Sequence, residues 1–367
     1  MSAQRSSTIE VPEIQVPFPL NRHPEYDHVR NHTYQWAVER GIMTADTARA
    51  HLDGLRYTDL ITGYYVGAPL SALCAINDFS VWFFAWDDRH DRDAVHGRTT
   101  AWYALQHALG ETLRAPDRHT GHDEPLVAGF ADCVLRLQER LGSGWAERFA
   151  SHFRRTIAAY GREFHNRTSG RIPSVTEYLS LRRHTFGMGV WLDCLELAAD
   201  RVLPETVRLS EPYQEAGWAC QEFAAWFNDL HSMAKEAAVR DVHNLGILLA
   251  REAGVSLREG ARLLAACLRA RVRDFERAEQ GVCLLAERLP ELEREAVRSC
   301  LYNMRNWISS VQLDPLPDRR VGGSHGTAIR ARQRAAGPCV AARTTDSAAS
   351  QLGGVPSERC TERAFRR

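Results

Sequence analysis

Three carboxylates stand close together at the end of an aromatic segment. The stretch VWFFAW at 81–86 runs directly into DDRHD at 87–91. If one helix continues through both, Asp87 and Asp91 are four residues apart and share a face. Carboxylate oxygens on one face suit Mg²⁺, which takes one or two protein carboxylates and completes its shell with water and phosphate oxygens. By itself, so short a pattern is more typical of a solvated, charged helix end.

A second group of oxygen ligands lies in NDLHSMAKE at 228–236. Asn228, Ser232 and Glu236 recur every four residues, so on a helix they form one stripe. The apolar run QEFAAWF lies immediately upstream, which predicts that the same helix packs its other faces into a core. The alternative is an ordinary polar face, but a helix that faces the core has no reason to align an amide, a hydroxyl and a carboxylate. The stripe therefore predicts a second set of metal ligands.

Two basic residues are candidates for binding phosphate. Arg182 lies in LRRHTFG, and Lys235 is the only lysine in the chain. A guanidinium offers a planar, bidentate donor to phosphate oxygens, whereas an ammonium acts as a point charge. For a single arginine in an arginine-rich chain, a surface salt bridge is the ordinary role. The phosphate role therefore depends on where these residues lie relative to the two ligand groups.

The elements that must position these residues are helices. From about residue 25 to 307, apolar residues recur at intervals of three and four, and few runs alternate with period two. The clearest segments with one apolar face are 98–113, 129–140, 213–240 and 256–287. We expect one all-α, many-helix bundle over residues 16–311, preceded by a mobile N-terminal arm at 1–15.

The composition changes abruptly at the C-terminal end. After Trp307 the only aromatic residue is Phe365, and Arg, Ala, Gly, Ser and Pro dominate. Such a segment cannot bury enough apolar surface to order itself. Residues 312–367 are therefore predicted to form a disordered tail.

Overall composition excludes several classes of protein. The 46 basic and 46 acidic residues cancel, so nothing favours a nucleic-acid partner held by its phosphates. No run of 18 apolar residues or signal-peptide pattern occurs, which argues against a membrane span or secretion. The 9 cysteines include no CxxC pair, which favours reduced thiols over a disulfide framework. We expect a cytoplasmic protein.

Together the two ligand groups resemble the aspartate-rich and Asn/Ser/Glu motifs of the bacterial class I terpene synthases. The resemblance implies a helical bundle around an apolar cavity, with three Mg²⁺ ions held at its mouth against a prenyl diphosphate. The implied direct ligands are Asp87, Asn228, Ser232 and Glu236, with Asp91 supporting them. Arg182 stands 46 residues before Asn228, the offset of the diphosphate-sensing arginine in this family. With Asp87 and Lys235 it completes the implied catalytic set.

Aromatic residues near these positions are predicted to line the cavity below the metals. Phe83 and Phe84 lie one helical turn before Asp87, and Phe186 and Trp191 follow Arg182 closely. Rings stabilise a nearby cation by about 0.5 to 2 kcal/mol, and a dry cavity prevents early quenching of a carbocation. Taken singly, each of these aromatics is more often plain core than cavity lining.

Longer stretches extend the likeness over about residues 15–311, among them FFAWDDRHDRD, REFHNRT, EYLSLRRHTF, QEFAAWFNDL and NMRNWISSV. They resemble members that cyclise the C15 substrate farnesyl diphosphate, which implies a sesquiterpene cyclase acting as a monomer or homodimer. One feature departs from the family pattern. Beyond Val311 the resemblance implies an aromatic helix ending in an Arg-Tyr pair, whereas this chain reads QLDPLPDRRVGGSHG. Arg319 or Arg320 is a partial substitute.

Three alternatives stay open at this point. A chain-elongating prenyltransferase would need a second aspartate-rich motif where this chain has NDLHSMAKE. A metal-dependent phosphohydrolase would use His90 and Asp91 as a ligand pair, but it leaves the Asn/Ser/Glu stripe unexplained. The third is an impaired cyclase that binds Mg²⁺ and diphosphate with little turnover, because the Arg-Tyr pair is missing.

Overall fold

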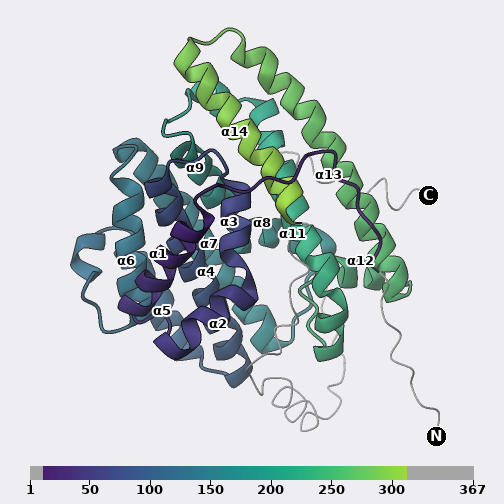
Figure 1. The fold of residues 1–367 in the computed structure, drawn as a ribbon. Helices are drawn as coiled ribbons and strands as arrows, with labels where there is room; N and C mark the ends of the chain where they lie inside the picture. The colour runs from purple at the N-terminus through teal and green to yellow at the C-terminus, as the bar shows by residue number, and fades with distance from the viewer. Residues whose placement is uncertain (1–10, 312–367) are drawn as a thin grey trace, which may run out of the picture.

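The structure, a computed structural model, describes residues 11–311, and these form helices without any β-strand. The α-helices are α1 (Tyr26–Glu39), α2 (Ala45–Leu55), α3 (Tyr57–Tyr64), α4 (Leu70–His96), α5 (Thr99–Thr112), α6 (Pro125–Gln138), α7 (Ser143–Ser169), α8 (Val175–Thr185), α9 (Met188–Ala198), α10 (Glu205–Arg208), α11 (Glu211–Val239), α12 (Leu245–Ala253), α13 (Leu257–Ala286) and α14 (Glu291–Ser310). A short 3₁₀ helix spans Pro116–His119. The predicted all-α class is confirmed (Figure 1).

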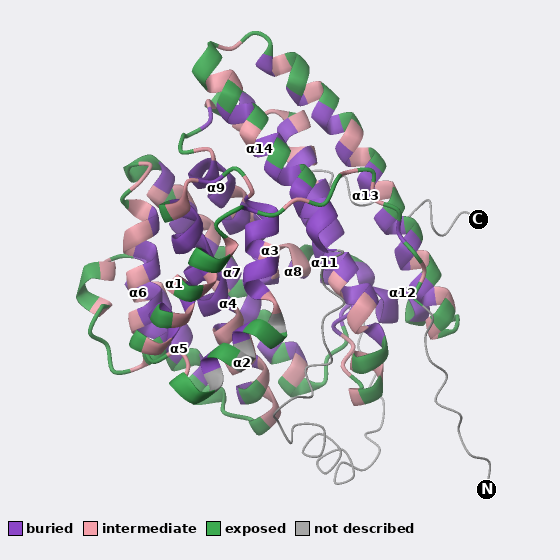
Figure 2. Ribbon diagram, in the orientation of Figure 1, coloured by how far each residue is buried: buried purple, intermediate pink, exposed green. Residues whose placement is uncertain are grey.

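Helix α4 contributes several rings to an aromatic cluster in the core. Trp82 stacks on Phe130 of α6 with ring centroids 4.4 Å apart, and Phe153 of α7 packs 4.6 Å from Phe130. Trp82 and Trp86 are fully buried. Figure 2 shows the outer turns of α13 and α14 exposed, whereas α3 and the middle of α11 are mostly buried. Burial of this aromatic face fixes the rotation of α4 about its axis, and so fixes where its carboxylates point.

Both ligand motifs lie within continuous helices, as the spacing predicts. Asp87 and Asp91 fall in the C-terminal half of α4, which ends at Gly97 with a left-handed φ of 66°. The second motif lies near the C-terminal end of α11, which begins where Ser210 Oγ accepts a hydrogen bond from Tyr213 N. The regular helical turn therefore aligns the residues of each motif on one face.

A break between α8 and α9 shapes the space between the motifs. Gly187 separates the two helices with a φ of +76°, and an added Cβ would lie 3.1 Å from Trp191 Nε1 and 3.3 Å from Phe83. A larger residue would be strained there and would press on both rings. The break leaves Arg182 at the end of α8 and brings Phe186 beside Trp191, whose Nε1 donates to Phe186 O at 2.9 Å.

An extended N-terminal segment crosses α13 and α14 and reaches α3 (Figure 1). Phe18 packs edge-on against Phe275 of α13, and Asn21 Nδ2 donates to Asn306 Oδ1 of α14 at 3.0 Å. Within the predicted arm 1–15, residues 11–15 lie here, with Ile14 buried and Arg269 donating to the Glu13 carbonyl. Residues 1–10 fall outside the described part of the chain.

The predicted tail 312–367 also lies outside the described residues, and with it Arg319 and Arg320. None of the helices in residues 11–311 combines the length and the apolar content that a membrane span requires.

Candidate active site

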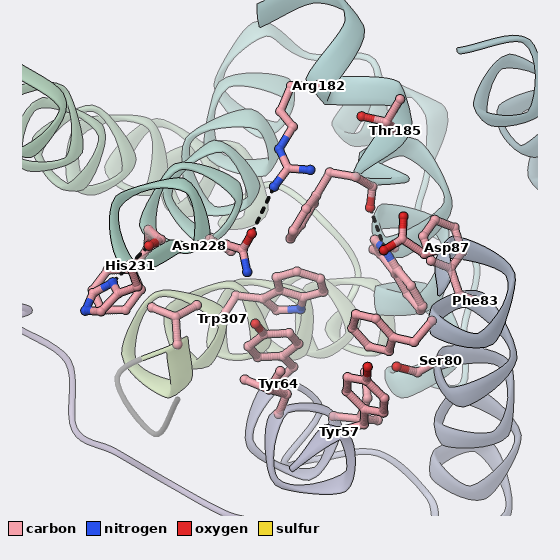
Figure 3. Close-up of a pocket in the computed structure, with 18 of the residues that line it drawn as sticks. Tyr57, Tyr64, Ser80, Phe83, Asp87, Arg182, Thr185, Asn228, His231 and Trp307 are labelled. Atoms are coloured by element: carbon pink, nitrogen blue, oxygen red, sulfur yellow. Dashed lines mark hydrogen bonds between the residues drawn. The ribbon is translucent and has the colours of Figure 1, made fainter. Parts of the chain in front are cut away.

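One pocket brings the sequence motifs together. It comprises about 980 Å³ of space between the helices, a figure that includes open solvent at its mouth. Asp87 of α4, Arg182 of α8 and Asn228 of α11 all line it. Figure 3 shows Asp87 and Asn228 on opposite sides, with Arg182 above and the rings of Trp307, Tyr64 and Tyr57 below. The two motifs therefore face one common space.

Asp87 is oriented by a tyrosine that the sequence did not single out. The buried Tyr160 of α7 donates its hydroxyl to Asp87 Oδ1 at 2.8 Å, and its ring stacks on Trp86. Burial and the neighbouring carboxylate raise the pKa of Tyr160 well above its ordinary value, so this hydroxyl stays a donor. One Asp87 oxygen is thereby held by the protein.

Asp91 lies one turn beyond Asp87 but does not line the pocket. Its Oδ1 lies 3.1 Å from His90 Nδ1 and 3.6 Å from Arg167 Nη1. Although desolvation opposes the effect, Arg167 and His90 lower the pKa of Asp91. Donor atoms of Asp87, His90 and Asp91 all lie within 4.8 Å of one another, so the first motif forms a compact group of ligand atoms.

Asn228 and Arg182 are in direct contact across the pocket mouth. Arg182 Nη2 donates to Asn228 Oδ1 at 3.2 Å and to Asp229 Oδ1 at 2.9 Å. Asp229 is buried and also accepts from the Tyr178 hydroxyl at 2.8 Å. Burial raises the pKa of Asp229, although Arg182 opposes that rise. The buried Arg182 Nε has no hydrogen-bond partner within residues 11–311, so this arginine keeps a donor for an anionic ligand.

Ser232 and Glu236 are held together by one amide. Asn244, the first residue before α12, donates its Nδ2 to Glu236 Oε2 at 2.8 Å and to Ser232 Oγ at 3.4 Å. Burial and the charges of Asp229 and Asp241 raise the pKa of Glu236 to about 7. Neither Ser232 nor Glu236 lines the pocket itself; they continue the Asn228 stripe along α11 toward its C-terminal end.

Lys235 is exposed near the C-terminal end of α11. Seven helical residues turn through about 700°, so Lys235 projects within about 20° of Asn228, two turns further along. The only lysine of the chain therefore lies on the same face as the second motif, outside the pocket lining.

The four predicted cavity aromatics, Phe83, Phe84, Phe186 and Trp191, all line the pocket. Tyr57, Tyr64 and Trp307 also line it, and they are not among the cavity residues predicted from the sequence. Tyr64 stacks on Trp307 at 3.9 Å between ring centroids. These rings come from α3 and α14, which lie far from the motifs in the chain, so only the folded bundle brings them to the cavity floor.

The donor set fits a hard divalent cation. Carboxylates, an amide oxygen and a hydroxyl from two helices are the ligands that Mg²⁺ takes in proteins, together with water and phosphate oxygens. No cysteine lines the pocket, and oxygen-rich sites favour magnesium over zinc. Arg182 lines the same pocket, and its buried Nε has no hydrogen-bond partner among residues 11–311.

Comparisons with known proteins agree with this arrangement. The profile of terpene synthase family 2, C-terminal metal binding, matches residues 78–274. Epi-isozizaene synthase of Streptomyces coelicolor is 45% identical over 311 residues, which cover 83% of this chain and 86% of that protein. Pristinol synthase of Streptomyces pristinaespiralis is 31% identical, covering 80% of each chain. The fold is similar to that of a solved hedycaryol synthase, with a TM-score of 0.71, 24% identity and coverage of 83% of this chain and 98% of that one. The chain thus belongs to the terpene synthase family and carries its divalent-metal-binding domain.

Proposed function

We propose that this protein is a Mg²⁺-dependent sesquiterpene cyclase that ionises farnesyl diphosphate and cyclises the resulting carbocation. The observation that carries the proposal is that Asp87, Arg182 and Asn228 line the mouth of a pocket whose remaining wall is largely aromatic and aliphatic. Polar donors at one end and apolar surface beneath match a substrate with a charged head and a hydrocarbon chain.

Metal binding is assigned to the two motifs. Asp87 would hold cations from the α4 side, with Asp91 supporting it, and the residues that would hold them from the α11 side are Asn228, Ser232 and Glu236. We infer three ions from the family resemblance. When bound, Mg²⁺ neutralises charge on the diphosphate and stabilises it as a leaving group. Asn244 and Tyr160 keep these oxygen ligands in position through the hydrogen bonds described above.

Arg182 and Lys235 are the proposed diphosphate donors. The C–O bond between the prenyl carbon and the diphosphate breaks, the diphosphate keeps the electron pair, and an allylic cation remains. Donors that act on the charge developing on the departing group accelerate this step. Arg182 supplies a planar guanidinium with paired N–H donors at the pocket mouth. Lys235 supplies a point charge from the same helix face as Asn228.

The aromatic wall acts on the cation. Phe83, Phe84 and Trp191 line the pocket close to Asp87, and each ring face stabilises a cation by about 0.5 to 2 kcal/mol, more when water is excluded. The wall also fixes the conformation of the flexible substrate chain, and this conformation selects among the possible ring closures.

The C15 substrate and the product rest on the relatives. The proposed product is epi-isozizaene, after the 45% identical synthase; a different sesquiterpene is the second candidate, because pristinol synthase is also similar. A cyclase domain at 16–311, a cytoplasmic location and a monomeric or dimeric state stay predictions from the sequence.

The other two enzyme classes fit the site less well. A prenyltransferase would need a second carboxylate cluster facing Asp87, but that position is occupied by the amide Asn228. A phosphohydrolase centred on His90 would need more than one imidazole around the metal, yet in the described chain the ligand group there consists of Asp87, His90 and Asp91.

The test is incubation of the purified full chain with farnesyl diphosphate and Mg²⁺, followed by gas chromatography and mass spectrometry of the hydrocarbon extract. A cyclic C15 product that disappears when EDTA is added supports the proposal. Geranyl and geranylgeranyl diphosphate, tested in parallel, determine the chain length. Release of farnesol alone in the presence of Mg²⁺ would indicate a phosphohydrolase.

A further inference from the structure

One arginine outside the recognised motifs contacts both of them. Arg167, on α7, lies with Nη1 3.6 Å from Asp91 Oδ1 and 2.6 Å from Asp241 Oδ2. Asp91 belongs to the first motif on α4, and Asp241 lies two residues after the end of α11, which carries the second. A single guanidinium group therefore spans the two helices that present the metal ligands.

The guanidinium is held in place from its own helix. Glu163 precedes Arg167 by one turn, and its Oε1 accepts from Nε at 3.1 Å and from Nη2 at 2.9 Å. These two bonds fix the plane of the fork and leave Nη1 facing Asp91 and Asp241. A planar guanidinium held along one edge keeps its carboxylate partners at a better-defined separation than a flexible ammonium would.

The far partner is tied directly to the second motif. Asp241 N donates to Glu236 O at 2.9 Å, and Asp241 Oδ1 accepts from His243 N at 3.0 Å. The same short loop ends at Asn244, whose amide binds Glu236 and Ser232. Movement of Asp241 would therefore displace the loop that orients the α11 ligands.

We propose that Arg167 is a positioning residue that sets the separation of the two metal-binding helices, so that ligands from α4 and α11 reach the same ions. This inference rests on the proposed function. In this role Asp91 and Asp241 are the structural partners of Arg167, one on each side. Arg167 itself contacts neither metal nor substrate.

Geometry and charge make opposite predictions for the loss of Arg167. If the residue only reduces the negative potential of nearby carboxylates, removing its charge strengthens the attraction for Mg²⁺. If it sets the helix separation, removing it spoils the convergence of the ligands and weakens binding. Loss of a group that orients metal ligands costs about 10- to 100-fold in metal affinity. The sign of the change separates the two roles.

The experiment compares Arg167→Gln, Arg167→Lys and Asp241→Asn with the unmodified full chain. Binding of Mn²⁺ in the presence of inorganic pyrophosphate is titrated by electron paramagnetic resonance, and the Mg²⁺ concentration giving half-maximal turnover of farnesyl diphosphate is measured separately. We expect about a tenfold or greater rise in both constants for Arg167→Gln and Asp241→Asn. Arg167→Lys keeps the charge without the fork and is expected to restore little.

Arg140→Gln is the matched control. Arg140 is as exposed as Arg167, with 23% of its side chain accessible in each case, and it likewise joins two segments through Ser71 and Asp200. Ser71 stands at the start of α4, about 24 Å along the helix from Asp87. This variant should leave both metal constants unchanged, whatever its effect on thermal stability.

The possible results test the positioning role of Arg167 separately from the proposed cyclase function. Unchanged or tighter Mn²⁺ binding by Arg167→Gln, or full recovery by Arg167→Lys, overturns the positioning role while leaving the cyclase intact. Equal weakening in Arg140→Gln overturns it as well, since a general loss of rigidity would then explain the effect. Failure of the unmodified chain to bind Mn²⁺ with pyrophosphate overturns the proposed function and the inference with it.

Discussion

Tyr57 lies face to face on Phe84, with ring centroids 3.8 Å apart and planes 3° from parallel. The stack joins α3 to α4 at the pocket wall, because both rings line the cavity. Phe84 therefore supports Tyr57, and under the proposed function it would also contribute to the surface against which the substrate chain folds.

Phe84→Ala should change the product mixture while the release of diphosphate continues. The metal ligands are untouched, but the wall loses a ring and Tyr57 loses its partner, which also lowers the free energy of unfolding by about 3 kcal/mol. Product profiles are compared by gas chromatography at equal conversion. Phe149→Leu, in the core away from the pocket, is the control and should keep the profile. An unaltered product spectrum in Phe84→Ala would mean that this ring does not guide cyclisation.

Asn228→Ala and Glu236→Ala should each remove most turnover. Each deletes a proposed oxygen ligand from α11, and a loss of about 1,000-fold corresponds to about 4 kcal/mol of transition-state stabilisation. The measurement is kcat at saturating farnesyl diphosphate over a range of Mg²⁺ concentrations, with thermal unfolding followed in parallel. A rate within twofold of the unmodified protein for Asn228→Ala would remove this residue from the ligand set.

The pH dependence of stability should include a contribution from His32. A hydrogen bond to the buried Asp78 raises the pKa of His32 above its usual value of 6.5, against the effect of desolvation. The protonated form is favoured in the folded state, so this stabilisation is fully present below about pH 6.5 and is lost as pH rises through the raised pKa. Asp78 also forms an ion pair with Arg136, which stays charged over this pH range.

Urea unfolding of the unmodified protein and of His32→Gln, from about pH 6 to pH 9, isolates this contribution. The difference in free energy of unfolding between the two should shrink as pH rises. A constant difference across that range would show that the imidazole charge does not stabilise the fold.

The C-terminal segment predicts a slow enzyme. Residues 312–367 contain no Arg-Tyr pair, and two missing donors worth about 3 kcal/mol each would cost several powers of ten unless Arg319 or Arg320 replaces them. We expect slow turnover with acyclic or hydroxylated by-products, and a higher rate when this segment is replaced by an aromatic helix bearing an Arg-Tyr pair. The two forms are assayed side by side on farnesyl diphosphate; equal rates and identical products would refute the argument.

The chain sequence predicts the motifs better than their surroundings. Four-residue spacing puts Asn228, Ser232 and Glu236 on one stripe because helical geometry is local. The partners that orient these groups are not local. Tyr160 reaches Asp87 from 73 residues away, and Arg167 reaches Asp241 from 74 residues away. Pairings of this kind depend on how whole helices pack, which periodicity in a single segment does not specify.

The single lysine of the chain is a selective site for chemical labelling. Because Lys235 is the only lysine among 367 residues and its side chain is exposed, amine-reactive esters have one target besides the terminal amino group. A fluorophore attached there would report on the mouth of the pocket. Immobilisation through Lys235 would instead anchor the molecule beside its proposed active site, so surfaces that couple through a terminal tag suit this protein better.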